Sequence, residues 1–213
     1  MANISRANGF RPVMHLNGSP YNGQFNRYTC PAAEVTAIGI GDFVIASSKP
    51  ILAPATGPGV ESIGTGSVTG GPIVGVVVGK EVILADGNVS GGTGPVLDNP
   101  QYKAASTLAY VYVADSPDLL FEGQEDGVSG AFTLAMTGYN VAIQGGAAST
   151  VTGRSIQMLD SSVAAVSTST YPLQLVKMVS RPDNEIGAYC RWLVRINVHT
   201  YGNAGAIAAV AKD

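Results

Sequence analysis

The sequence has little charge. Only 13% of its 213 residues are charged, against about 25% in an average soluble domain. So few charges favour a surface that neighbouring molecules partly cover, although an ordinary β-sandwich with an uncharged surface has a similar composition. The densest basic stretch is spread over strand-like sequence and consists of Lys177, Arg181, Arg191 and Arg195. Nucleic-acid binding needs a clustered basic surface because phosphate contacts supply most of the affinity, so we set that class aside.

Cysteine and histidine are also scarce. With only Cys30 and Cys190, the chain has no disulfide framework, and we expect two separate, reduced and buried thiols. Neither cysteine lies in a C-x-x-C motif, and His15 and His199 are far apart in the sequence. The usual ligands of a zinc site are missing, and we predict no metal and no other cofactor.

Long apolar runs are absent. No run reaches the roughly 18 residues that a membrane-spanning helix requires, and the apolar tail at 204–211 is short enough for a strand or a packed terminus. The first ten residues are polar and lack the apolar core of a secretory signal. These features predict synthesis in the cytoplasm and no contact with a membrane.

What the sequence does contain is glycine, 27 residues of it, together with many short β-branched runs between turn residues. Short strands at intervals of about 8–12 residues are typical of a sandwich or barrel, and long amphipathic helices are hard to find. We therefore predict an all-β fold, a small barrel or sandwich with Gly-rich loops at 53–72 and 86–100. The strand candidates are 36–40, 42–46, 73–78, 81–85, 107–114, 119–122, 132–136, 139–144, 154–159, 173–179 and 191–199.

Three parts follow from this pattern. Residues 1–32, here called the leader, hold three Asn-Gly turns with aromatic residues between them and predict an extended N-terminal arm. Such an arm either packs on its own domain or reaches a neighbour, and the sequence does not choose. Residues 33–119 predict a barrel-like first half. Residues 120–213 predict a β-rich second half, which could complete the same domain.

The sequence contains no motif that is typical of a catalytic site. The glycines at 64–70 do not have the G-x-G-x-x-G spacing, and a β-run follows them rather than a helix. Ser129 lies in a loose relative of G-x-S-x-G, but the alternating α/β chain that this motif needs is missing. We interpret Ser129 as a turn residue and predict no catalytic residue.

The other candidates for chemistry have simple interpretations. The acidic residues Glu122, Glu125 and Asp126 predict a solvated loop or a charged surface for a partner rather than a calcium site. In the alternating strand at 191–199, Trp192 falls on the apolar face and is expected in the core. His199 falls on the polar face and is expected at the surface or at an interface.

Three stretches together resemble a family of tailed-bacteriophage virion proteins of about this length, which act as capsid cement or decoration proteins. The first is GFRPV at 9–13 with HLNGSP at 15–20. The second is YVYVAD at 110–115 with DLLFE at 118–122, and the third is RPDNE at 181–185 with WLVRIN at 192–197. They lie near the start, middle and end of the chain, whereas the two long Gly-rich loops do not contribute.

The resemblance implies a non-enzymatic protein on the outer surface of the assembled phage head. There it would bind the major capsid protein between capsomers and stabilise the shell against internal DNA pressure. The resemblance also implies a homo-oligomer, with a trimer favoured by analogy. The expected partner-binding residues are in the leader, because aromatic residues often anchor interfaces: Phe10, Arg11, Tyr21, Phe25 and Tyr28. The alternatives are that the aromatic residues complete the chain's own core, that the protein belongs to the tail, baseplate or head–tail joint, or that it is a host-glycan-binding β module.

Overall fold

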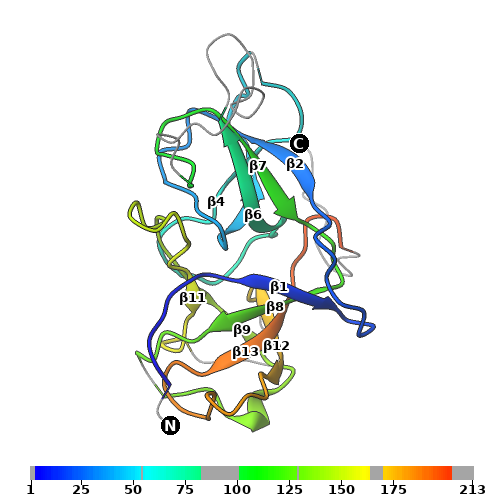
Figure 1. The fold of residues 1–213 in the computed structure, drawn as a ribbon, viewed down its shortest axis with the longest axis vertical. Coiled ribbons are helices and arrows are strands. Elements are labelled where there is room, and N and C mark those ends of the chain that lie inside the picture. Colours follow the sequence, from blue (N-terminus) through cyan, green and yellow to red (C-terminus); the bar gives the residue numbers. More distant parts are fainter. Residues whose placement is uncertain (1–2, 54, 83–100, 129, 164–169, 203–213) are drawn as a thin grey trace.

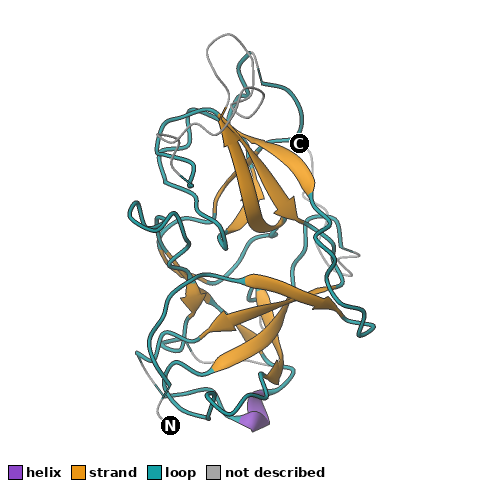
Figure 2. Ribbon diagram, in the orientation of Figure 1, coloured by secondary structure: helices purple, strands orange, loops and turns teal. Residues whose placement is uncertain are grey.

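The computed structural model describes residues 3–53, 55–82, 101–128, 130–163 and 170–202, and it confirms the all-β prediction. The strands form three antiparallel sheets, and one sheet lies above the other two along the long axis of the molecule (Figure 1). Within the described residues the helical structure is a single 3-10 turn, Leu134–Met136 (Figure 2). No helix in these ranges is long and apolar enough to cross a membrane.

The upper sheet in Figure 1 is closed into a small barrel. Its strand order is β2 (Asn26–Cys30), β7 (Ala109–Ala114), β6 (Gly75–Val82), β3 (Phe43–Ala46) and β4 (Val60–Ser62). A bridge between Thr29 and Gly59 joins the two edges, and the Thr29 N–H donates to the Pro58 carbonyl at 2.8 Å. β-branched residues fill the interior, as the period of two along each strand requires: Val44, Val60, Val74, Val77, Val111 and Val113, with Tyr28, Cys30 and Ile38.

The second unit lies below the barrel and consists of two sheets. The larger has the order β1 (Arg11–His15), β8 (Leu119–Gln124), β13 (Arg191–Ile196), β12 (Leu173–Met178) and β9 (Asn140–Val141). The smaller has the order β11 (Met158–Leu159), β10 (Ile143–Gly145) and β5 (Gly66–Val68). Trp192 is fully buried between these elements, where its ring meets Phe132 edge-on at 6.4 Å, so the prediction for this residue is confirmed.

One hydrophobic core joins the second unit to the barrel. Phe43, Ile73 and Val76 of the barrel belong to the same buried cluster as Phe121 and Trp192. Burial of each such side chain contributes about 1.5–3 kcal/mol, so the contact between the units is a substantial part of the fold.

Phe10 of the leader lies at this contact and is 2% exposed. Its ring packs against Phe43 with centroids 4.5 Å apart, and its N–H donates to the Gly41 carbonyl at 2.9 Å. On the other side it covers Gly123 of β8, where an added Cβ would lie 2.2 Å from the ring. Only glycine leaves room for the ring at that position.

The leader is therefore not a separate arm. It runs along the second unit as β1, turns, and rises into the barrel as β2 (Figure 1). Of the two alternatives left open by the sequence, the structure has the leader packed on its own chain. The predicted halves also interleave, because β5 from the first half pairs with β10 of the second, and β8 crosses the predicted boundary at 119–120.

Several local predictions were wrong. The Gly-rich loop 53–72 contains β4 and β5, and the strands predicted at 73–78 and 81–85 are one strand, β6. The strands predicted at 132–136 and 139–144 do not form a hairpin with each other, since β9 pairs with β12 and β10 pairs with β5 and β11. Burial of Phe132 against Trp192 draws residues 132–136 away from a strand. The predicted loop 86–100 lies outside the described residues.

Both cysteines are free and buried, as expected. Cys30 lies in the barrel cluster and Cys190 in the cluster of the second unit. Burial raises the pKa of the Cys30 thiol to about 12, which keeps it in the unreactive thiol form.

The burial of Phe10 predicts a large difference between two leader aromatics. Phe10→Ala should lower the free energy of unfolding by about 3–5 kcal/mol, because it opens a cavity between the two units. Phe25→Ala should cost about 1 kcal/mol, since the ring is 51% exposed and only packs on Tyr112. Urea unfolding of both variants measures this, and equal losses would show that the leader does not pack as described.

Candidate functional site

The structure separates the five expected partner-binding residues into two groups. Phe10 and Tyr28 are buried in the chain's own cores, at 2% and 4% exposure, so they are not available as anchors for a partner. Arg11, Tyr21 and Phe25 keep accessible side chains. For Phe10 and Tyr28, completion of the protein's own core was the correct alternative.

An aromatic groove lies beside the leader where it passes from one unit to the other. This groove has a volume of about 600 Å³, and Tyr21, Phe25 and Tyr201 line it together with His15 and Asp115. Phe25 and Tyr201 are 51% and 54% exposed, which is unusual for large rings on one concave surface. Tyr201 was not singled out in the sequence, because it reaches the groove only through the path of the chain after β13.

The polar residues at the base of the aromatic groove are held in place. The Tyr28 hydroxyl donates to Asp115 Oδ2 at 2.6 Å, and the Asn26 amide donates to the same carboxylate at 3.0 Å. Burial, followed by the hydrogen bond to Asp115, raises the pKa of Tyr28, so this hydroxyl stays a proton donor. These hydrogen bonds therefore fix the positions of the polar side chains beside the rings of the groove.

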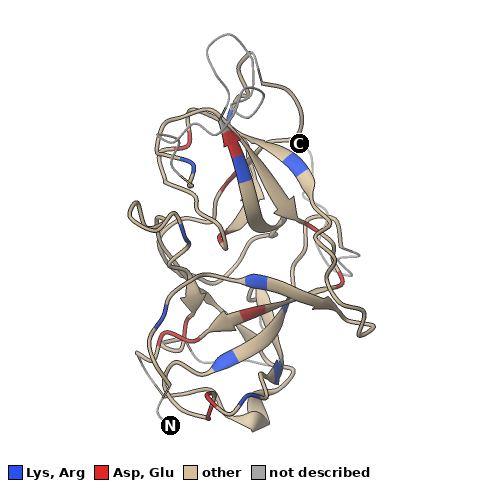
Figure 3. Ribbon diagram, in the orientation of Figure 1, with Lys and Arg blue, Asp and Glu red and all other residues tan. Residues whose placement is uncertain are grey.

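A second feature is a buried carboxylate held by three arginines. Glu122 of β8 is 5% exposed. Its Oε2 accepts from Arg11 of the neighbouring β1 at 2.7 Å, and its Oε1 accepts from Arg181 at 2.9 Å and Arg191 at 3.2 Å. Figure 3 shows the charges alternating across the adjacent strands β1, β8 and β13. Burial alone would raise the pKa of Glu122, but the arginines hold it below its ordinary value.

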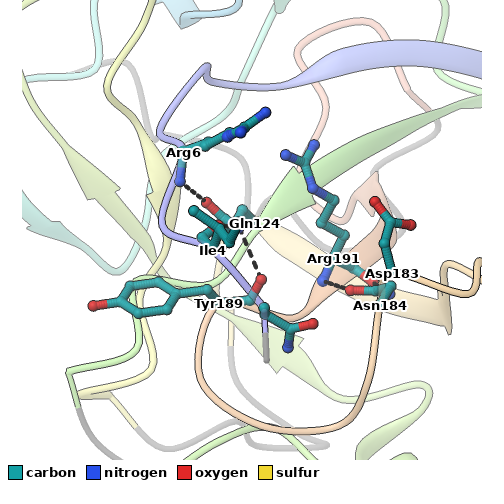
Figure 4. Close-up of a pocket in the computed structure, with 8 residues that line it drawn as sticks. Ile4, Arg6, Gln124, Asp183, Asn184, Tyr189 and Arg191 are labelled. Carbon is teal, nitrogen blue, oxygen red and sulfur yellow. Dashed lines mark hydrogen bonds between the residues drawn. The ribbon is translucent and has the colours of Figure 1, made fainter. Parts of the chain in front are cut away.

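Residues 3–6, here called the strap, lie across the end of the same sheet (Figure 4). The amide of Gln124 substitutes for a strand partner, since Oε1 accepts from the Arg6 N–H at 2.8 Å and Nε2 donates to the Ile4 carbonyl at 2.9 Å. Asn3 adds bonds to the turn after β12, donating to the Glu185 carbonyl at 2.7 Å. A cavity of about 200 Å³ remains beneath the strap, bordered by Tyr189 and Arg191.

The acidic residues after β8 are not a solvated loop, so that prediction was wrong. Glu122, Glu125 and Asp126 are 5%, 0% and 7% exposed. Asp126 Oδ1 accepts from the Ser161 N–H at 3.1 Å, and Glu125 Oε2 accepts from the Phe132 N–H at 3.1 Å. The described residues contain no cluster of acidic, histidine or cysteine side chains that could hold a metal ion.

The prediction that His199 lies at the surface or at an interface was also wrong. His199 is 4% exposed, and its Nδ1 accepts from the Tyr201 N–H at 3.0 Å. Desolvation lowers its pKa, so it stays neutral. Ser129 lies outside the described residues. Of the glycines at 64–70, Gly66 belongs to β5 and pairs with Gly145 of β10. Buried His199 bridges Ile73 and bonds to its own turn, so it serves the fold.

Comparison of the chain with protein-family models, with curated proteins and with solved structures gives no match. The aromatic groove and the arginines around Glu122 are two accessible features that a partner or ligand could reach.

The arrangement around Glu122 predicts a measurable loss in the Glu122→Gln variant. Three arginines would face one another without a carboxylate, which should lower the free energy of unfolding by about 1–3 kcal/mol at pH 7, less than for a fully buried pair because the arginines are partly solvated. Because the pKa of Glu122 is lowered, the difference from the unmodified protein should shrink as the pH falls through that lowered value. Glu61→Gln, which breaks the 3.2 Å pair with Lys49, is the control and should cost less than about 1 kcal/mol. Equal losses at the two positions would contradict this description.

The buried carboxyl group of Glu125 makes the free energy of unfolding depend on pH with the sign opposite to that expected for Glu122. Burial raises the pKa of Glu125 from an ordinary value of 4.5 to about 7, and nearby Asp126 raises it further against the hydrogen bonds from Phe132 and Cys190. The folded state then holds the proton more tightly than the unfolded state, so stability is lost as the pH rises from 4.5 to 7. The loss is about 3 kcal/mol at 1.4 kcal/mol per pH unit.

Glu125→Gln removes this loss. The free energy of unfolding of the variant, relative to the unmodified protein, should therefore rise between pH 4.5 and pH 7.5. Buried Asp42 and His199 titrate in both proteins, so the difference isolates Glu125. A difference that stays constant across this range would show that Glu125 titrates normally.

Proposed function

We propose that this chain is a structural protein of a tailed-phage particle, of the capsid cement type. In this role it is non-enzymatic and binds the major capsid protein on the outer surface of the assembled head, between capsomers. The resemblance of the three sequence stretches names the family. The aromatic groove is the observation in the fold that carries the proposal, because it provides an adhesive surface.

The aromatic groove has the composition of an interface hot spot. Large rings that are half exposed around a concave surface lose little conformational entropy on binding and bury much apolar area. Phe25 comes from the leader and Tyr201 from the chain after β13, and Leu16, next to His15, is a further exposed apolar side chain at 51%. A partner loop or strand edge that covers these side chains would remove them from water.

The titrating groups support adhesion rather than catalysis. The carboxyl groups with strongly raised pKa values, Asp42 and Glu125, are 2% and 0% exposed and belong to the packed interior. Catalytic acids and bases instead need contact with a substrate in an open site. Neither Asp42 nor Glu125 lines the aromatic groove, the cavity beneath the strap or the cavity beside the arginines around Glu122.

Adhesion of this kind would be sufficient to reinforce a shell. A standard protein interface buries about 1,600 Å², and each 1.4 kcal/mol gained across a seam shifts the equilibrium against opening about tenfold. Several copies acting together as a homo-oligomer would gain further through multivalency. Each molecule therefore needs only moderate affinity for the capsid.

The same groove favours a second candidate, a host-glycan-binding module. Sugars bind to shallow sites with aromatic faces and a carboxylate, and the groove combines Phe25 and Tyr201 with Asp115. Binding on a glycan array that Phe25→Ala abolishes would favour this function. The tail, baseplate or head–tail joint is distinguished by copy number, since cement is present throughout the head and a joining protein only at one vertex.

The cement proposal predicts the behaviour of groove variants with capsids. Purified protein should co-sediment with expanded empty heads that lack it, and Phe25→Ala and Tyr201→Ala should each weaken binding at least about tenfold. Tyr139→Ala is the matched control, a 36% exposed tyrosine outside the groove, and should bind as the unmodified protein does. Absence of co-sedimentation by the unmodified protein would refute the cement role, and full binding by both groove variants would refute the role of the groove.

A further inference from the structure

The arginines around Glu122 line an open cavity of about 400 Å³ between the barrel and the second unit, here called the arginine cleft. Its walls come from distant parts of the chain, including the leader, β6, β8 and β13. The four basic residues that line it are Arg11, Arg154, Arg181 and Arg191, and the single acidic residue is Glu122. The size is within the range of small-ligand sites.

The arginine cleft has an excess of positive charge in a chain whose net charge is −3. Four guanidinium groups face one carboxylate. Asp183 lies outside the cleft, 3.5 Å from Arg181 Nε, and counting it still leaves two more positive than negative charges. Five of the chain's 12 basic residues lie at this cleft or beside it, since Arg6 borders the neighbouring cavity under the strap.

Neutralising Glu122 does not account for this number of arginines. One guanidinium satisfies a carboxylate through two parallel hydrogen bonds, whereas here three arginines each use a single nitrogen on Glu122. Each guanidinium has five N–H donors, so most of their donors are not used by Glu122. Like charges gathered around one acid repel one another unless another anion is bound.

Arg154 shows the excess most clearly. It comes from the loop before β11 and lines the arginine cleft, yet no ion pair or hydrogen bond from the described residues reaches its guanidinium group. Arg181 Nε is a buried donor that also lacks a hydrogen bond within the described chain. Arg154 is exposed, and Arg181 Nε has only the ion-pair partner Asp183 at 3.5 Å, so among the described residues both groups lack a hydrogen-bond acceptor at this concave surface.

We propose that the arginine cleft is a binding site for a small oxyanion, a carboxylate or phosphate group that lies between Arg154 and the three arginines on Glu122. Planar guanidinium groups bind both kinds of group through paired hydrogen bonds. The apolar side chains of Pro12 and Val78 and the ring of Tyr21 border the same space, so the ligand carries an organic portion as well as its charge. This site is independent of the virion role.

The test uses citrate and inorganic phosphate as probes, each titrated into the full-length protein by calorimetry at an ionic strength held constant with sodium chloride. We expect saturable binding of one anion per chain and a rise in melting temperature beyond that caused by chloride alone. Tighter binding of citrate would identify the natural group as a carboxylate, and tighter binding of phosphate would identify it as a phosphate.

Arg154→Gln is the decisive variant, because this side chain makes no bond to the described residues and its loss should leave their packing unchanged. Its affinity for the tighter probe should fall at least about tenfold. Arg11→Gln, at a side chain 70% exposed, should also weaken binding. Arg27→Gln is the matched control, since Arg27 stacks on Tyr110 of the barrel outside the arginine cleft.

Two results would overturn the proposal. One is that neither probe binds beyond the effect of chloride. The other is that Arg154→Gln and Arg11→Gln both bind as tightly as Arg27→Gln, which would show that the anions bind elsewhere.

Discussion

The ring of Phe10 holds the two units of the molecule together. It lies on the bare backbone of Gly123 in the second unit and against Phe43 in the barrel, with its N–H bonded to the Gly41 carbonyl. Because this ring is buried, the leader is committed to its own chain, and β1 and β2 are placed in two different sheets. The passage of the leader between them then forms one wall of the aromatic groove and part of the arginine cleft. Both candidate surfaces thus depend on one buried contact.

Several of the chain's few charged residues either bond to other parts of the fold or line a cavity. Glu122 joins three strands and a turn through its arginines, while Glu125 and Asp126 satisfy backbone N–H groups in the interior. Arg154 adds a fourth guanidinium group to the arginine cleft. A composition that is poor in charge therefore still contains one cavity with a clear excess of positive charge.

The sequence predicted the strands that show a clear local pattern of apolar residues. β7, β8, β12 and β13 were all predicted, because alternating or β-branched runs reveal strands that pack on a core. β4 and β5 have three residues each and lie among glycines, so no period could show them. Burial of Glu122 could not be predicted because its partners are at 11, 181 and 191. His199 lies beyond the end of β13 and is buried where it bridges Ile73, so the alternation of β13 does not apply to it. Arg11, Tyr21 and Phe25 stay predicted contacts. Phe10 and Tyr28 were predicted as anchors because the sequence does not distinguish an aromatic residue in a core from one at an interface.

The adhesive role is tested most directly by a cryo-electron microscopy reconstruction of the purified phage particle that carries this protein. Our description predicts density for the barrel and the second unit on the outside of the head between capsomers, with the leader folded on its own chain and the rings of Phe25 and Tyr201 against the capsid protein. A head whose outer surface has no such density, or a molecule bound with these rings facing solvent, would contradict it.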